Sequence, residues 1–119
     1  MYEEEAAQPE TPAPRFATFE TLTAVDAHTL TEDVEIGDGS MVRVRGLTRY
    51  EIQLHGKGDP DASTVEARNL AACIVEPKLS VEQVKAWQAR CAAGGDVATV
   101  SRRIRDLSGL GERADKSNV

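Results

Sequence analysis

The sequence predicts an α+β protein that is mainly α-helical, with an N-terminal antiparallel β-hairpin followed by a small bundle of about four helices. Two observations carry this prediction. Apolar and charged residues alternate on both sides of a glycine-rich turn, which is typical of a hairpin. Further along the chain, N-capping residues, apolar stripes at helical spacing and helix-ending residues recur in that order. Aromatic residues make up only 4% of the chain, so the core must be built from Val, Leu, Ile and Ala.

Length and charge limit the class of protein. A chain of 119 residues predicts one domain. The net charge of −6 argues against a general binder of the phosphate backbone, which needs a basic surface. The acidic N-terminus does not resemble a signal peptide, and no apolar run is long enough for a membrane span. We expect a cytoplasmic protein in which Cys73 and Cys91 are reduced and half-buried, without membrane or nucleic-acid partners.

The N-terminal part is acidic and rich in proline. Residues 1–17 cannot bury enough apolar surface to offset the entropy of ordering, so they predict a disordered tail. The tail is either merely solvated or a recruitment arm with Phe16 and Phe19 as anchors, and these two side chains could equally pack on the domain. Residues 18–26 have no sustained period and predict irregular or weakly extended chain. One domain is expected over residues 18–110, followed by a flexible C-terminus at 111–119.

The hairpin is predicted over residues 33–45, around Gly37-Asp38-Gly39. Opposed residues of a hairpin share a face. A two-residue turn would therefore pair Val42 with Glu35 and place the valines on the wrong side. A loop of three or five residues instead gathers the apolar side chains on one face, namely Val34, Ile36, Val42 and Val44. The same register sets Asp33 and Glu35 against Arg43 and Arg45 on the solvent face.

Four helices are expected at about 48–55, 64–75, 81–93 and 97–108. Pairs of a hydroxyl residue and a Glu or Gln three residues later predict capping boxes at the first three, and an aspartate is expected to cap the fourth. These are Thr48 with Glu51, Ser63 with Glu66, Ser80 with Gln83, and Asp96. Pro77 should end the second helix by about Val75, because the residue before a proline avoids the α region.

The apolar stripes of these helices predict the core. Leu47 and Ile52 are expected to face inward in the first helix, and Trp87 should be the largest anchor of the helical body. The second stripe consists of Ala67, Leu70, Ala71 and Ile74. The last consists of Val97, Val100, Ile104 and Leu107, with Gly109 as the residue after its C-cap.

No constellation of catalytic, cofactor-binding or metal-ligating residues is recognisable. His28 and His55 have no nearby nucleophile in a known motif, and His55 is expected to interact with the last carbonyls of its helix. Gly56-Lys57-Gly58 lacks the spacing of a phosphate-binding loop, and Asp59-Pro60-Asp61 lacks the ligand series of a calcium loop. The sequence therefore predicts a binding module rather than an enzyme.

Over Asp33 to Leu110 the order of elements resembles that of the tail assembly chaperones of long-tailed bacteriophages. The matching segments are Val44-Arg45-Gly46-Leu47-Thr48, Val75-Glu76-Pro77 with Leu79, and Leu107-Ser108-Gly109-Leu110. The resemblance implies a non-enzymatic protein of the host cytoplasm that binds the tape measure protein, assists the tail tube protein and is absent from the mature virion. Self-association is a further expected partner interaction. The family is often made in two lengths by a ribosomal frameshift, and this chain would correspond to the short form.

Two other classes remain open. One is a structural virion component, such as a head–tail connector or tail subunit, in which the hairpin would be an assembly edge. The other is a small regulator that binds nucleic acid through the arginine-rich last helix, with Arg102, Arg103 and Arg105, although the net charge counts against it.

Overall fold

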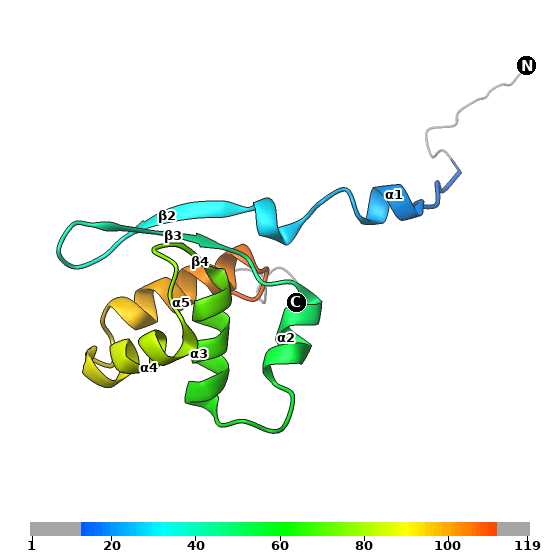
Figure 1. Ribbon diagram of the computed structural model, residues 1–119. Helices are drawn as coiled ribbons and strands as arrows, with labels where there is room; N and C mark the ends of the chain where they lie inside the picture. The colour runs from blue at the N-terminus through cyan, green and yellow to red at the C-terminus, as the bar shows by residue number, and fades with distance from the viewer. Residues whose placement is uncertain (1–12, 112–119) are drawn as a thin grey trace, which may run out of the picture.

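The computed structural model describes residues 13–111 (Figure 1). This part of the chain is α+β, as predicted, with five α-helices and a three-stranded antiparallel sheet. Its elements are α1 (Phe19–Leu22), η1 (Ala27–Thr29), β2 (Thr31–Glu35), β3 (Met41–Arg45), α2 (Arg49–His55), α3 (Ala62–Cys73), β4 (Ile74–Glu76), α4 (Val81–Arg90) and α5 (Asp96–Leu107). Within residues 13–111 no helix is long and apolar enough to cross a membrane.

The hairpin of β2 and β3 has the predicted parity. Val34 is directly opposite Val42, and residues 36–40 connect the strands, so the loop has an odd number of residues. The Ile36 N–H donates to the Ser40 carbonyl at 2.9 Å, and Gly39 adopts a φ of +89°, which glycine tolerates best. Val34, Val42 and Val44 are buried together, with Ile36 packed against them.

On the charged face of the hairpin, the structure has one of the expected pairs of opposite charge, Asp33 with Arg43. Arg43 Nε donates to Asp33 Oδ1 at 2.7 Å, and this hydrogen bond lowers the pKa of Asp33. Glu35, however, is opposite Met41, and Arg45 is opposite Thr31. Glu35 and Arg45 therefore do not take part in the expected charge pairing across the hairpin, and the guanidinium of Arg45 binds a glutamate on α2 instead.

The second predicted helix is shifted and is followed by a strand that the sequence analysis missed. Asp61 caps α3 in place of Ser63, accepting from the Thr64 N–H at 2.8 Å. The helix ends at Cys73 instead of Val75, and Ile74–Glu76 form β4, which pairs antiparallel with β3. The β-branched Ile74 and Val75 suit a strand, and pairing with β3 stabilises a segment too short to be recognised alone.

The ends of α4 and α5 also differ from those predicted. Helix α4 has the predicted Ser80–Gln83 capping box but ends at Arg90, because Cys91 is already extended. Gly95 occupies the N-cap position of α5, so the prediction that Asp96 caps this helix is wrong. The Asp96 carboxylate instead accepts from the Gly37 N–H at 3.0 Å and ties the hairpin loop to α5.

The C-terminus of α5 is confirmed as predicted. Gly109 has a φ of +76°, and the Leu110 N–H donates to the Arg105 carbonyl at 2.8 Å. Together with the bond from the Gly109 N–H to the Asp106 carbonyl, this is a Schellman motif.

The core lies between the sheet and the helices α3, α4 and α5, which cover one face of it (Figure 1). The largest fully buried side chains are Leu70, Ile74, Ile104, Val44, Val84, Val100 and Cys73. Trp87 is only half-buried at the margin of this core. Trp87 therefore packs against the core from its edge, and branched aliphatic side chains occupy the centre. Whether Trp87 is the largest anchor of the helical body stays a prediction.

The N-terminal segment is more regular than predicted. Helix α1 has a capping box between Thr18 and Thr21, and η1 follows after four residues. Helix α1 extends away from the rest of the molecule (Figure 1), and Phe16 and Phe19 are 87% and 74% exposed. The alternative in which these two side chains pack on the domain is not what the structure has.

Candidate partner-binding groove

The junction between β3 and α2 is seated on the end of α5. Gly46 is buried, and a Cβ at this position would be 3.1 Å from the Leu107 carbonyl oxygen. The Leu47 N–H donates to Ser108 Oγ at 2.8 Å, and the Leu47 side chain is buried. Glycine suits this close approach of two backbones, because a side chain would require the Leu107 backbone to shift, and the approach fixes the point at which α2 leaves the body.

The first turn of α2 is then attached to β3 by charge. Glu51 completes the predicted capping box with Thr48, and Arg45 donates to both carboxylate oxygens of Glu51, at 3.0 and 2.8 Å. The hydrogen bond from Arg45 lowers the pKa of Glu51 to about 2. His28 Nε2 lies 3.4 Å from the same carboxylate, so η1 is held at this point as well.

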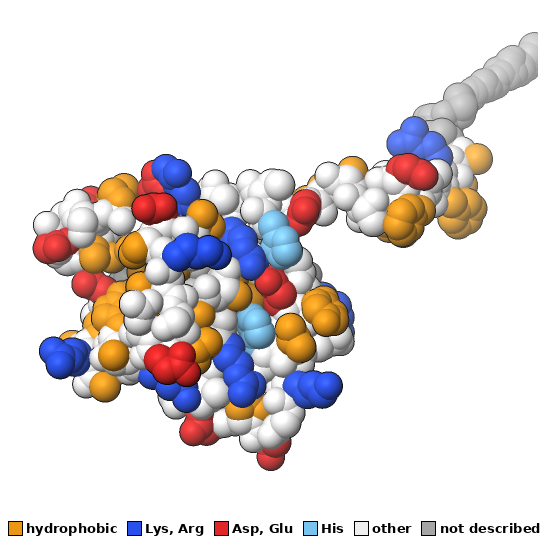
Figure 2. Space-filling view, in the orientation of Figure 1, with side chains coloured by type: hydrophobic (Ala, Val, Ile, Leu, Met, Phe, Trp, Pro, Cys, Tyr) orange, Lys and Arg blue, Asp and Glu red, His pale blue; other side chains and the backbone are white. Residues whose placement is uncertain are grey.

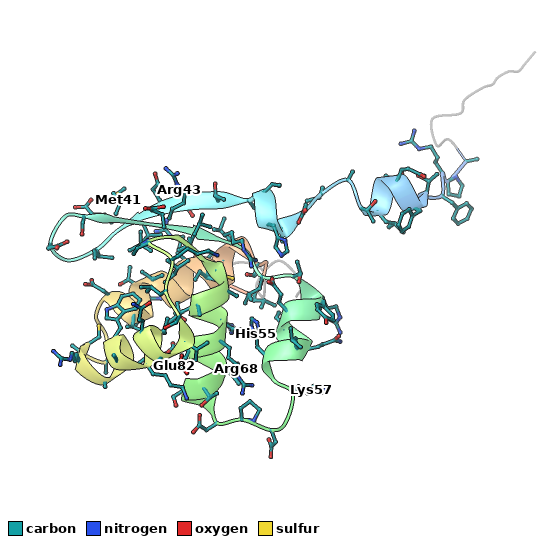
Figure 3. The ribbon with its side chains drawn as sticks, viewed as in Figure 1. Met41, Arg43, His55, Lys57, Arg68 and Glu82 are labelled. Atoms are coloured by element: carbon teal, nitrogen blue, oxygen red, sulfur yellow. The ribbon has the colours of Figure 1, made fainter. Side chains whose placement is uncertain are left out.

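The end of α2 is attached to α3 by polar contacts. His55 Nδ1 and Asn69 Oδ1 are 2.6 Å apart, and Arg68 donates to the His55 carbonyl at 2.9 Å. His55 and Arg68 lie between α2 and α3 (Figure 3). The predicted contact of His55 with its own last carbonyls is replaced by one to the neighbouring helix.

Between these attachments, the apolar side chains of α2 remain accessible. Ile52 is 39% exposed, although it was predicted to face inward, and Leu54 and Tyr50 are more exposed still. Their exposure means that α2 is held chiefly by its termini and by Leu47 rather than by an apolar stripe.

A groove of about 340 Å³ lies between α2, α3 and α5. Its apolar lining consists of Leu47, Ile52, Val65, Leu70, Ile104 and Leu110. Glu66, Asn69, Ser101 and Arg105 add polar atoms to the lining. An apolar lining with a few polar groups suits the apolar face of an amphipathic helix. We call this surface the α2 groove.

Charged side chains of both signs lie in the lining of the α2 groove and on the residues next to it. Arg49 is the first residue of α2, and Lys57 follows the end of that helix. Arg68 donates a hydrogen bond to the His55 carbonyl, and Arg105 donates one to the Leu110 carbonyl. Within residues 13–111, no ion pair involves any of these four side chains. Glu66 is the acidic residue of the lining, and its oxygens accept from Gln88 and Ser101. Glu51, Asp61 and Asp106 each adjoin a lining residue in the sequence. Basic and apolar side chains are interspersed over this face (Figure 2).

A second apolar pocket of about 170 Å³ lies at the other end of the molecule. Ile36, Val42, Ile74, Pro77, Leu79 and Trp87 line it, between the hairpin and α4. It is half the volume of the α2 groove and is lined almost entirely by apolar atoms. The half-buried ring of Trp87 forms one wall.

The histidines and cysteines that were candidates for catalysis or metal binding do not form a common site within the described residues. His28 and His55 make separate contacts, with Glu51 and Asn69. Cys73 is fully buried rather than half-buried, and burial raises the pKa of its thiol to about 11, which disfavours the thiolate. Cys91 is also a free thiol, and its Sγ accepts from the Val97 N–H at 3.4 Å.

The described residues do not contain a cluster of three metal-ligating side chains. Of the α5 arginines, Arg103 donates to Glu32 at 2.9 Å and Arg105 donates to the Leu110 carbonyl. Two of the three therefore have partners within the protein.

Val65 and Leu110 line the α2 groove, although neither belongs to an apolar stripe predicted from the sequence. Val65 lies off the predicted stripe of α3, and Leu110 follows the end of the last stripe. An apolar residue outside the stripe of an amphipathic helix was the available signal for Val65. Comparisons with protein-family models, with curated proteins and with solved structures found no match for this chain.

Proposed function

We propose that this protein is a non-enzymatic tail assembly chaperone of a long-tailed bacteriophage. In this role it binds the tape measure protein in the host cytoplasm, helps the tail tube protein assemble around it and leaves before the virion is complete. The proposal rests on the order of elements and the short motifs over Asp33 to Leu110. The α2 groove is the structural observation that supports it.

The α2 groove has the properties needed to hold an amphipathic helix. Its apolar floor can cover the apolar face of a client helix, and the polar groups of its lining can remain in contact with the client's polar edge. The net charge of −6 helps to keep the resulting complex soluble. A long helical protein such as a tape measure protein needs this kind of cover before assembly.

Coexpression tests the proposal. The tape measure gene of the same phage is expressed alone, with the wild-type chain, and with an Ile52→Glu variant. Ile52 lines the groove and is 39% exposed, so the substitution places a charge in the groove without emptying the core. We expect soluble tape measure protein with the wild-type chain and insoluble protein with the variant.

Met41→Glu is the matched control, because Met41 is 53% exposed on the hairpin, outside the lining of the groove. This variant should keep the client soluble. If Ile52→Glu solubilises the client as well as the wild type does, the groove is not the client site. A tape measure protein that stays insoluble with the wild-type chain, together with this chain in purified virions, would favour a structural virion component.

The proposed frameshift is placed close to Leu110-Gly111-Glu112. Gly111 is buried, and a Cβ there would overlap Asp106 Oδ1, so Leu110 and Gly111 belong to the packed end of α5. A change of frame after Gly111 would keep this end of the fold intact. Expression of the natural gene with its downstream region and an N-terminal tag should yield a second, longer tagged band, whereas a single band at the short length would contradict the frameshift.

A further inference from the structure

The N-terminal segment of residues 16–25 has apolar side chains that nothing in the described structure covers. Phe16, Phe19, Leu22 and Val25 are 73–87% exposed and recur every third residue. The chain has two phenylalanines, and both are in this segment. A small protein with so few aromatic residues gains nothing for its fold by leaving both in solvent, which marks the segment as an interaction element. We call it the apolar arm.

The α2 groove matches the apolar arm in size. A cavity of about 150 Å³ is sufficient to hold benzene, so the 340 Å³ of the groove can accept about two aromatic rings. The apolar arm offers two such rings, three residues apart. The groove also has length, from Leu47 at the start of α2 to Ala62 at the start of α3. The smaller pocket at Trp87, of about 170 Å³, has room for only one ring.

The two surfaces are also complementary in charge. Residues 1–26 contain six carboxylates and a single arginine. Arg105 lines the groove, and Arg68 binds the His55 carbonyl between α2 and α3. Neither side chain forms an ion pair within the described residues. An acidic segment with apolar anchors therefore fits a groove that has an apolar floor and offers Arg105 and Arg68 to its carboxylates.

The geometry of the apolar arm favours a groove on another molecule. Asp26 accepts from the His28 N–H, and His28 contacts Glu51, so the chain is attached to the body just after the arm. Helix α1 points away from the body at this point (Figure 1). The described chain makes no return to its own groove, because α1 extends outward from the point at which Asp26 and His28 attach it to the body (Figure 1).

We propose that the apolar arm of one copy docks, through Phe16 and Phe19, in the α2 groove of a second copy. The interaction is reciprocal in a closed dimer, since each copy carries one arm and one groove. The inference stands apart from the proposed function, because it concerns the purified chain alone. A client helix would compete with the arm for the same groove.

Sedimentation of the full-length chain over a range of concentrations tests this inference. The wild type should associate reversibly from 12.9 kDa to twice that mass. The double variant Phe16→Ser, Phe19→Ser and the single variant Ile52→Glu should each raise the dissociation constant at least about tenfold, as expected for truncation of central anchors. Met41→Ser, an exposed apolar residue on the hairpin, should leave it unchanged, and circular dichroism should show all variants folded.

Mixing the two defective proteins separates docking between copies from docking within one chain. The Ile52→Glu protein retains an intact arm, and the double phenylalanine variant retains an intact groove. An equimolar mixture should therefore form a heterodimer, although neither protein associates alone. The inference would be overturned by a wild type that is monomeric, or by a mixture that stays monomeric. It would also be overturned if Leu79→Glu, in the pocket at Trp87, abolished association as Ile52→Glu does.

Discussion

The body and the flank of this molecule are held together in different ways. The body, made of the sheet with α3, α4 and α5, is joined by fully buried aliphatic side chains such as Leu70, Ile74 and Ile104. The flank consists of α1 and α2, and neither helix has a buried residue. Helix α1 extends away from the body (Figure 1), and α2 is attached to it by hydrogen bonds and one ion pair. The stabilisation from apolar burial grows with the apolar area removed from water. A hydrogen bond or an ion pair, by contrast, can attach a helix without covering its apolar side chains. Attachment by polar contacts therefore leaves the apolar side chains of the flank accessible for binding.

The largest difference between the two regions is expected for aliphatic truncation. Leu70→Ala removes a fully buried side chain and should lower the free energy of unfolding by about 2–5 kcal/mol. Ile52→Ala, on the flank, should lower it by less than about 1 kcal/mol because the side chain is already partly in water. Urea denaturation of both variants measures the contrast, and equal losses would show that α2 is part of the core.

The substitution Trp87→Ala measures how much the half-buried ring at the edge of the core contributes to the free energy of unfolding. A fully buried Trp would cost about 3–5 kcal/mol on truncation, but the half-buried ring at the Trp87 pocket should cost about 1.5–2.5 kcal/mol. Far-UV circular dichroism follows the urea transition without the Trp signal. A loss above 4 kcal/mol would confirm Trp87 as the anchor predicted from the sequence.

Glu51→Gln tests the polar attachment of the flank. Gln retains the capping box but loses the charge that binds Arg45, so we expect a loss of about 1–2 kcal/mol at neutral pH. The pKa of Glu51 is lowered from 4.5 to about 2 in the folded protein, so its stabilisation is present above pH 4.5 and is lost as the pH falls toward 2.

Wild-type and Glu51→Gln proteins should therefore differ in stability at pH 6 and converge near pH 2. Parallel urea titrations across this pH range check the prediction, and a constant difference at all pH values would assign the effect to packing. Asp33→Asn serves as a comparison, because the Asp33–Arg43 pair is more exposed and should contribute less.

The smallest effect is expected at the N-terminus. Deletion of residues 1–14 should change the stability by no more than about 0.5 kcal/mol, because the composition of this segment offers little to bury. Most of these residues lie outside the described part of the chain, so the prediction rests on sequence. An appreciably lower melting temperature after truncation would show that the segment docks on the fold.

Local patterns were sufficient for much of the fold. The alternation around Gly37-Asp38-Gly39 predicted the hairpin and its odd loop, and three capping signals, at Thr48, Ser80 and Gly109, were correct. These signals act between residues close in sequence, so no tertiary information is needed to recognise them. The cap of α3 shows where they become ambiguous, since Asp61 and Ser63 both suited the position and Asp61 took it.

The groove could not be predicted in the same way. The apolar spacing of α2 indicated an inward face at Ile52, yet Arg45, Asn69 and Arg68 hold α2 at its two ends without covering that face. These partners come from β3 and α3, outside the helix to which Ile52 belongs. A periodic pattern states which side chains would gain from burial, but not whether a neighbour lies close enough to bury them.

The sequence by itself therefore determined the α+β class, the parity of the hairpin and several helix ends, because steric preference and capping operate over a few residues. Tertiary structure decided that Ile74–Glu76 would be a strand, that Asp96 would bind Gly37 rather than cap its helix, and that α2 would stand off from α3 and α5. Each of these depends on a contact between distant segments, and its free energy exists only once the chain has brought those segments together.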